Sequence, residues 1–409
     1  MPQYETKVSV EDLKVGMYVC RLDRPWIETH FLFQGFHISN DADMQELQRT
    51  CEYVFVDPER GTEPDRRPLQ PRRNKPIGEE IFRSAPEQDV YPVVTSMDEE
   101  LQAARDSRAG TLAEVGNILD DLKAGRKIQV ESVRRAVAGM IASILRNPDA
   151  FLWLTRLKDK DSYAYAHCVD ASSLAVAFGR HLGFAQPALE DLAIGTLLFD
   201  IGKLQLPDDI LKKPGRLTEK EFALIRRHVD FGVQIVQEMK GSNKDIVATV
   251  GYHHERHDGK GYPRGVAGKR IPVFGRIAAL VDCYDAITSE RPYSHAMSVY
   301  DAVQLIYEWR GKDFQSDMVE QFIQCIGVFP AGTLVELSTG EVGIVIAQNR
   351  VRRLKPRIML VLDSNKLALE FNPILDLIDN PMDSAGRPVD IRQPLVPGSY
   401  GIHASDFYL

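Results

Sequence analysis

The chain has 409 residues, of which 44% are hydrophobic and 26% are charged, and this composition excludes a protein that is disordered throughout. At roughly 150 residues per domain, the length predicts two or three domains. The formal net charge of −8 argues against a broad surface for polymeric nucleic acid, so an anionic ligand would need a local pocket.

A small N-terminal α/β domain is predicted over residues 1–60. Short β-like runs at Met17–Leu22, Phe31–Ile38 and Tyr53–Val56 accompany a helical stretch at Asp43–Arg49. Residues 61–96 follow with many prolines and several basic residues, which is typical of a linker. A solvated linker face explains these basic residues more simply than contact with an acidic partner or a nucleotide.

Helices are predicted over residues 97–328. Apolar residues recur at helical spacing in a first helix that ends at Gly125, namely Leu112, Val115, Leu119 and Leu122. A second apolar stripe begins at Val133 and stops before Pro148. Thr218 and Glu221 form a capping box at the start of a helix predicted over Glu219–Met239.

A small C-terminal β-rich extension is predicted over residues 329–409. Apolar and β-branched runs at Thr333–Leu337, Val342–Ile346 and Arg357–Leu362 are separated by polar turns. The predicted fold class is therefore mainly α, with a helical core flanked by a small α/β domain and a β-rich extension.

The sequence lacks the features of a membrane or secreted protein and those of a cysteine-based metal site. No segment has the ~20 apolar residues of a membrane span, and residues 1–10 lack the apolar core of a secretory signal. The five cysteines are scattered and form no CxxC pair, which argues against a disulfide framework or a thiolate zinc site. We therefore expect a cytoplasmic protein in which nitrogen and oxygen atoms would hold any metal.

Histidines gather in the helical region, and the pair His253-His254 is the most informative of them. It precedes a loop that contains Gly259 and Gly261. Adjacent imidazoles at a helix end can face one cleft, and glycines let the backbone approach a ligand closely. The pattern predicts a ligand site at this loop.

The stretch His253-His-Glu-Arg-His-Asp-Gly-Lys-Gly-Tyr-Pro263 resembles the HHExxDGxGYP signature of the HD-GYP family, bacterial metal-dependent phosphodiesterases that hydrolyse cyclic di-GMP. Matching segments at Leu197–Lys203, Pro207–Gly215 and Arg276–Thr288 extend the resemblance over about 150–328. The N-terminal segment resembles an uncharacterised domain that often precedes HD-GYP domains, and the segment from Pro330 resembles a β extension that some members carry. The resemblance implies an all-helical HD-type hydrolase core.

It also implies two divalent metal ions, with iron or manganese expected from imidazole and carboxylate ligands. The implied ligands are His167, Asp200, His228, His253, His254 and Asp282. Asp200 would bridge the ions, with the histidines 228, 253 and 254 on one of them and the other two residues leaning toward the second. Such a pair would bind the phosphate, activate a hydroxide and neutralise the leaving oxygen.

Other matched positions are given roles by the same resemblance. Asp200 and Lys203 are the implied catalytic residues, and Asp285 would orient a ligand or a water molecule. The implied substrate-binding residues are Lys203, Gly261, Tyr262, Pro263 and Arg291, the last of which would neutralise a substrate phosphate.

The chain departs from the family pattern at two positions. Phe199 stands where an HD motif has histidine, and Tyr163 stands where some members have a glutamate associated with a third metal. We therefore expect at most two ions, one of them short of a ligand. The alternative function is a degenerate domain that binds cyclic di-GMP or a partner protein without catalysis. The sequence does not decide whether the substrate is another cyclic dinucleotide or whether the final product is pGpG or GMP. It also does not identify signalling partners or the oligomeric state.

Overall fold

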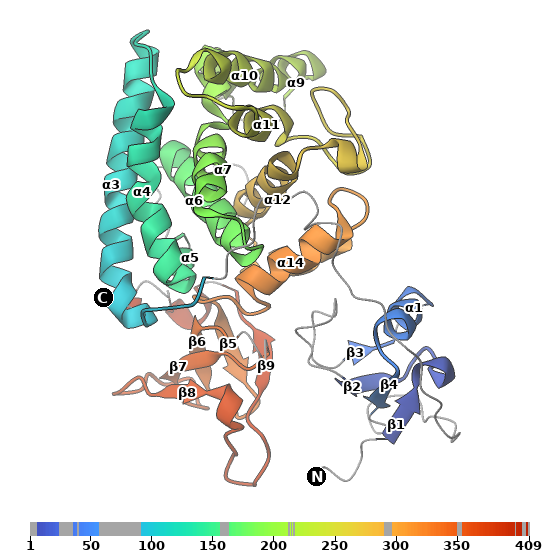
Figure 1. The fold of residues 1–409 in the computed structure, drawn as a ribbon. Coiled ribbons are helices and arrows are strands. Elements are labelled where there is room, and N and C mark those ends of the chain that lie inside the picture. The colour runs from blue at the N-terminus through green and yellow to red at the C-terminus, as the bar shows by residue number, and fades with distance from the viewer. Residues whose placement is uncertain are drawn as a thin grey trace.

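The computed structural model describes residues 6–23, 36–38, 41–56, 91–155, 163–211, 213, 215, 217–289, 297–349, 354–396, 398–402 and 406–407. In chain order, a small sheet, a large helical region and a second small sheet follow one another (Figure 1). The prediction of a mainly α protein with small sheets near both ends is confirmed. None of the described helices has the length and apolar character needed to cross a membrane.

The N-terminal sheet is antiparallel, has the strand order β1-β4-β2-β3 and is accompanied by one helix. Its elements are β1 (Thr6–Ser9), β2 (Tyr18–Leu22), β3 (Phe36–His37), α1 (Asp41–Thr50) and β4 (Tyr53–Val56). Val19, Leu47 and Val54 are fully buried in a core of their own. The sequence did not predict β1, and residues 31–35 of one predicted strand lie outside the described part.

A long helical hairpin opens the helical region, formed by α3 (Met97–Lys123) and α4 (Val130–Arg146). Ser96 and Glu99 form a capping box at the start of α3, and Gly125 follows its end with a φ of 74°. The predicted stripe on α4 is buried, as the periodicity indicated. Arg108 of α3 donates to the fully buried Asp170 at 2.9 Å and so joins the hairpin to the next long helix.

The helices that position the candidate site surround two central ones, α6 (Tyr163–His181) and α7 (Gln186–Leu198), which are apolar on nearly all sides (Figure 1). The remaining helices are α5 (Pro148–Leu154), η3 (Ile201–Gln205), α8 (Asp208–Leu211), α9 (Glu219–Arg226), α10 (His228–Glu238), α11 (Lys244–Tyr252), η4 (Gly268–Arg270), α12 (Val273–Thr288), α13 (Val299–Glu308) and α14 (Ser316–Ile326).

The prediction of one helix over Glu219–Met239 was wrong, because the chain turns at Arg227 between α9 and α10. The Arg227 N–H donates to the carbonyl of Leu224, only three residues back, at 3.1 Å, which tightens the last turn. The predicted capping box at Thr218 is present. His228 is therefore the first residue of α10.

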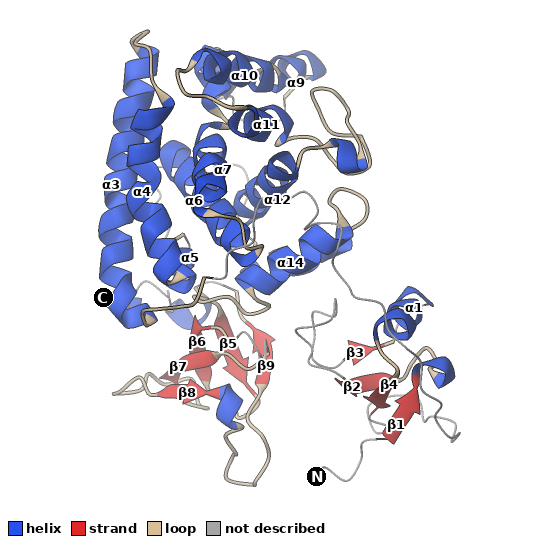
Figure 2. Ribbon diagram, viewed as in Figure 1, coloured by secondary structure: helices blue, strands red, loops and turns tan. Residues whose placement is uncertain are grey.

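The C-terminal sheet is antiparallel with the order β8-β7-β6-β5-β9 (Figure 2). Its strands are β5 (Leu334–Leu337), β6 (Val342–Ala347), β7 (Arg357–Leu362), β8 (Ile374–Asp376) and β9 (Ile391–Pro394). The first three match predicted strands, whereas β8 and β9 were not predicted. The domain boundaries at residues 60, 96 and 328 stay a prediction.

Candidate metal centre

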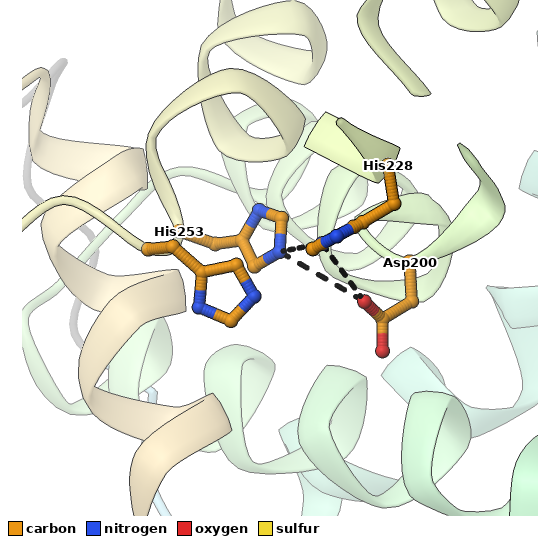
Figure 3. Close-up of side chains that lie close together, drawn as sticks. Asp200, His228 and His253 are labelled. Carbon is orange, nitrogen blue, oxygen red and sulfur yellow. Dashed lines mark hydrogen bonds and ion pairs between the residues drawn. The ribbon is translucent and has the colours of Figure 1, made fainter. Parts of the chain in front are cut away.

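Four side chains from three separate parts of the helical region converge on one point. Asp200 lies between α7 and η3, His228 begins α10, and His253 and His254 follow α11. One ligand atom from each lies within 4.8 Å of those of the other three. The Nε2 atom of His228 is 3.4 Å from Asp200 Oδ1 and 3.3 Å from His253 Nε2. Dashed lines mark these contacts in Figure 3.

The hydrogen bonds behind the two imidazoles fix which nitrogen faces the cluster. His228 Nδ1 donates to the carbonyl of Ile225 and His253 Nδ1 donates to that of Val250, each at 2.7 Å. Because a carbonyl only accepts, Nδ1 carries the proton in both rings and the Nε2 lone pairs point into the cluster. These backbone bonds orient the rings as the outer partners of metal-binding histidines do.

The cluster fits a cation better than any arrangement of hydrogen bonds within the described part of the chain. Two Nε2 lone pairs and a carboxylate oxygen repel one another at these distances unless a positive charge lies among them. Asp200 Oδ1 is buried and has no hydrogen-bond partner, which is rare for such an atom. Nitrogen and oxygen donors of this kind suit a divalent first-row metal.

The protonation of the histidines also suits a metal. Burial and, to a smaller extent, the neighbouring His228 ring lower the pKa of His253 to about 4. Burial likewise lowers the pKa of His228 and, more strongly, that of His254. All three imidazoles are therefore neutral near pH 7 and need to lose no proton before they bind a metal.

A second group of ligand atoms faces the other oxygen of Asp200. His167 Nε2 of α6 is 3.9 Å from Asp200 Oδ2 and 3.3 Å from Asp282 Oδ1 of α12. His254 Nδ1 lies 3.8 Å from Asp282 Oδ2 and so borders both groups. The two oxygens of Asp200 thus point to two different sets of ligands, which is the arrangement that a bridging carboxylate requires.

Asp285 holds His167 from behind. Its Oδ2 is 2.6 Å from His167 Nδ1, and the carboxylate is 1% exposed. Burial acts to lower the pKa of His167, but the hydrogen bonds to Asp282 and Asp285 outweigh it and raise the pKa to about 10. Without a metal, His167 is therefore a cation between two carboxylates.

Lys203 and Phe199 flank Asp200. The Nζ of Lys203 donates to Asp200 Oδ2 at 2.6 Å. Burial would raise the pKa of Asp200, yet the Lys203 charge and the imidazoles hold it well below its usual range. The Phe199 ring is fully buried and packs against His167 and His253, with ring centres 5.6 and 4.9 Å away. Phe199 therefore forms an apolar wall of the site and supplies no ligand.

Close backbone packing sets the position of Asp200 relative to His228. A Cβ atom at Gly202 of η3 would overlap the carbonyl oxygen of His228 and the backbone nitrogen of Gly232. Only glycine lets η3 lie directly on α10 in this way.

The loop after His254 folds back over it and forms one side of the site. The Tyr262 N–H donates to the His254 carbonyl at 3.1 Å, and the two rings stack with centres 4.5 Å apart. A Cβ at Gly261 would overlap the backbone of residues 254–256. Glu255, which is 1% exposed, accepts from the backbone N–H groups of Arg264 and Val266 and pins the loop.

The structure brings most of the predicted residues together. Pro263 follows Tyr262 in the same loop. Arg291 lies outside the described residues, as does the side chain of Tyr163. Glu255 had no predicted role, although it lies between the histidine pair and the glycines in the sequence. The two backbone amides that it binds come together only in the folded loop.

The comparisons with known proteins divide the chain in two. The HD domain family matches residues 147–317, and a domain of unknown function, DUF3391, matches residues 5–133. A cyclic di-GMP phosphodiesterase of Pseudomonas aeruginosa is 33% identical over 355 residues, which cover 86% of this chain and 84% of that protein. A 3'3'-cGAMP-specific phosphodiesterase of Vibrio cholerae is 34% identical over 146 residues, which cover 35% of this chain and 27% of that protein.

Among solved structures, an HDG"Y"P protein from Bdellovibrio bacteriovorus is 15% identical, with a TM-score of 0.46. The match covers 78% of this chain and 98% of that one.

Proposed function

This chain belongs to the HD-GYP family of cyclic di-GMP phosphodiesterases, and from that membership we propose that it is a cytoplasmic enzyme that hydrolyses one phosphodiester bond of cyclic di-GMP to give linear pGpG. The observation that carries the proposal is the Asp200 carboxylate, which is 11% exposed and whose two oxygens face two separate sets of ligand atoms. The relative that is 33% identical over 84% of its length is a cyclic di-GMP phosphodiesterase.

We propose that two divalent ions, iron or manganese, bind on either side of Asp200. When bound, such ions polarise phosphoryl oxygens and lower the pKa of a water molecule. His228, His253 and His254 would hold one ion, and His167 with Asp282 would hold the other. In this proposal, Asp285 keeps His167 oriented, and the Lys203 ammonium lies where it can bind a substrate phosphate oxygen.

Binding without hydrolysis is the second candidate, and Phe199 is the observation that favours it. Its buried ring occupies space beside His167 and offers no ligand atom. In that case cyclic di-GMP would bind at the Tyr262 loop without turnover, and the chain would act through a partner protein.

The experiment is a turnover assay on protein purified anaerobically and loaded with Mn²⁺ or Fe²⁺, with metal analysis of the same sample. Products from cyclic di-GMP, 3'3'-cGAMP and cyclic di-AMP are separated by chromatography, and binding of each is titrated in parallel. We expect pGpG from cyclic di-GMP. Binding with no product at full metal content would favour the second candidate, and faster turnover of 3'3'-cGAMP would change the assigned substrate.

A variant pair ties activity to the cluster. We expect His254→Ala to lose metal and turnover while keeping the helical circular dichroism signal, because it removes one of the converging ligands. His181→Ala is the matched control, since His181 is exposed and contacts Gln321 away from the cluster. Full metal content in His254→Ala would refute the ligand assignment.

A further inference from the structure

Two exposed side chains, Phe222 and Arg226, contact the Tyr262 ring, which separates them from the cluster of candidate metal ligands. Phe222, 41% exposed, and Arg226 are four residues apart on α9 and so share one face of that helix. The guanidinium carbon of Arg226 is 4.4 Å from the centre of the Phe222 ring and 4.9 Å from that of Tyr262. Tyr262 in turn stacks on His254, which connects the pair to the cluster.

Arg226 has no carboxylate partner within ion-pair distance in the part of the chain that the structure describes. Its side chain is exposed and its contacts are with the two aromatic rings. Such rings hold a guanidinium by its positive charge but do not satisfy its N–H groups as a carboxylate would. The N–H groups of Arg226 therefore remain available to a ligand beside the site.

We propose that Phe222 and Arg226 form a purine-binding subsite and that Arg226 selects guanine over adenine. A base has a flat π-face that stacks on an aromatic or guanidinium surface, and guanine presents two acceptors, O6 and N7, that match the paired N–H groups of arginine. Adenine presents a donor in place of O6. The inference rests on the proposed function, since a cyclic dinucleotide whose phosphate reached the cluster would carry its base outward past Tyr262.

The test compares substrates with and without a purine. We measure KM and kcat of metal-loaded wild type and Arg226→Ala for cyclic di-GMP, cyclic di-AMP and bis(p-nitrophenyl) phosphate, which has no base. Arg226→Ala should raise the KM for cyclic di-GMP about tenfold more than the KM for bis(p-nitrophenyl) phosphate, a typical loss for one stacked or bidentate base contact. The preference for cyclic di-GMP over cyclic di-AMP should fall by a similar factor. Phe222→Ala should raise KM for both cyclic dinucleotides.

Arg227 supplies the matched control. It carries the same charge one residue later and is exposed, but its guanidinium lies 4.6 Å from the ring of Phe231 and not at Tyr262. Arg227→Ala should leave the ratio of the KM values for cyclic di-GMP and bis(p-nitrophenyl) phosphate unchanged. A melting curve for each variant detects any loss of folding.

Two results would overturn the subsite. An equal effect of Arg226→Ala on all three substrates would place Arg226 on the phosphate or in folding, and no effect on any of them would remove it from binding. If the wild type hydrolyses none of the cyclic dinucleotides, the proposed function fails. The subsite is then judged by the Kd for cyclic di-GMP, which Arg226→Ala should still raise about tenfold if the pair binds guanine.

Discussion

Replacing Phe199 with histidine tests whether the second half of the metal centre lacks a ligand. The Phe199 ring lies between His167 and His253 and is fully buried. A histidine there would place a nitrogen next to the ligand group of His167 and Asp282. If that group is one ligand short, Phe199→His should tighten the binding of the second ion and raise turnover at limiting metal.

The structure sets the cost when no metal is present. The Nδ1 atoms of the two flanking histidines are already bonded to Asp285 and to the Val250 carbonyl, so neither Nδ1 atom is free to bond the new imidazole, and the largest cost is that of a buried polar ring without a partner. Such a group costs about 1–3 kcal/mol, and each kcal/mol corresponds to about 2–4 °C in Tm for a domain of this size. A metal that binds the new nitrogen at a hundred times its Kd would return about 2.7 kcal/mol.

The assay measures Tm, metal stoichiometry and turnover of Phe199→His across a Mn²⁺ titration. Phe199→Leu serves as the apolar control, because it keeps the site free of nitrogen, and its own loss of stability gives the cost of removing the buried ring. We expect added Mn²⁺ to raise the Tm of the histidine variant by more than it raises the Tm of the leucine variant. A histidine variant that is destabilised at every Mn²⁺ concentration, with unchanged metal content, would refute the ligand-deficit account.

Two further predictions concern metal binding and packing. The pKa of His167 is raised to about 10 in the metal-free protein, so an ion bound there must displace a proton. The affinity for Mn²⁺ should therefore rise about tenfold per pH unit between pH 7 and 9, as measured by calorimetric titration. The same pH dependence in His167→Ala would contradict this prediction. Gly202→Ala should lower the free energy of unfolding by more than about 3 kcal/mol and reduce the metal content, because the new Cβ overlaps the backbone of α10. In the control Gly116→Ala in α3, the new Cβ meets no atom within 4 Å, so the Tm in the same thermal melts should be unchanged or higher.

The apolar pattern predicted the helices and strands whose burial leaves a clear pattern in the sequence. It failed where contacts between distant segments determine the bounds of a helix or strand. The stripe from Val133 marks one buried face of α4, whereas the continuous apolar runs of β5 to β7 reflect strands that are buried on both faces. The turn at Arg227 has no glycine or proline to mark it, and it directly precedes the part of α10 that packs against η3. The strands β8 and β9 are short and have prolines within or beside them, so pairing with the central strands defines them.

The site divides in the same way. The motif identified the candidate ligand residues, because their types and order are specific. No pattern in the sequence shows that the two oxygens of Asp200 face two different groups of ligand atoms. Phe222 and Arg226 were missed for a similar reason. They become a pair with Tyr262 only when α9 and the loop, 36 or more residues apart in sequence, meet in space.

The metal-free centre carries its own counterions. The protonated His167 and the ammonium of Lys203 lie against the carboxylates of Asp200, Asp282 and Asp285, which are at most 13% exposed, and they offset most of the negative charge that burial would otherwise penalise. We therefore expect the domain to fold before it binds metal, because its large hydrophobic core and these internal cations need no ion to be in place.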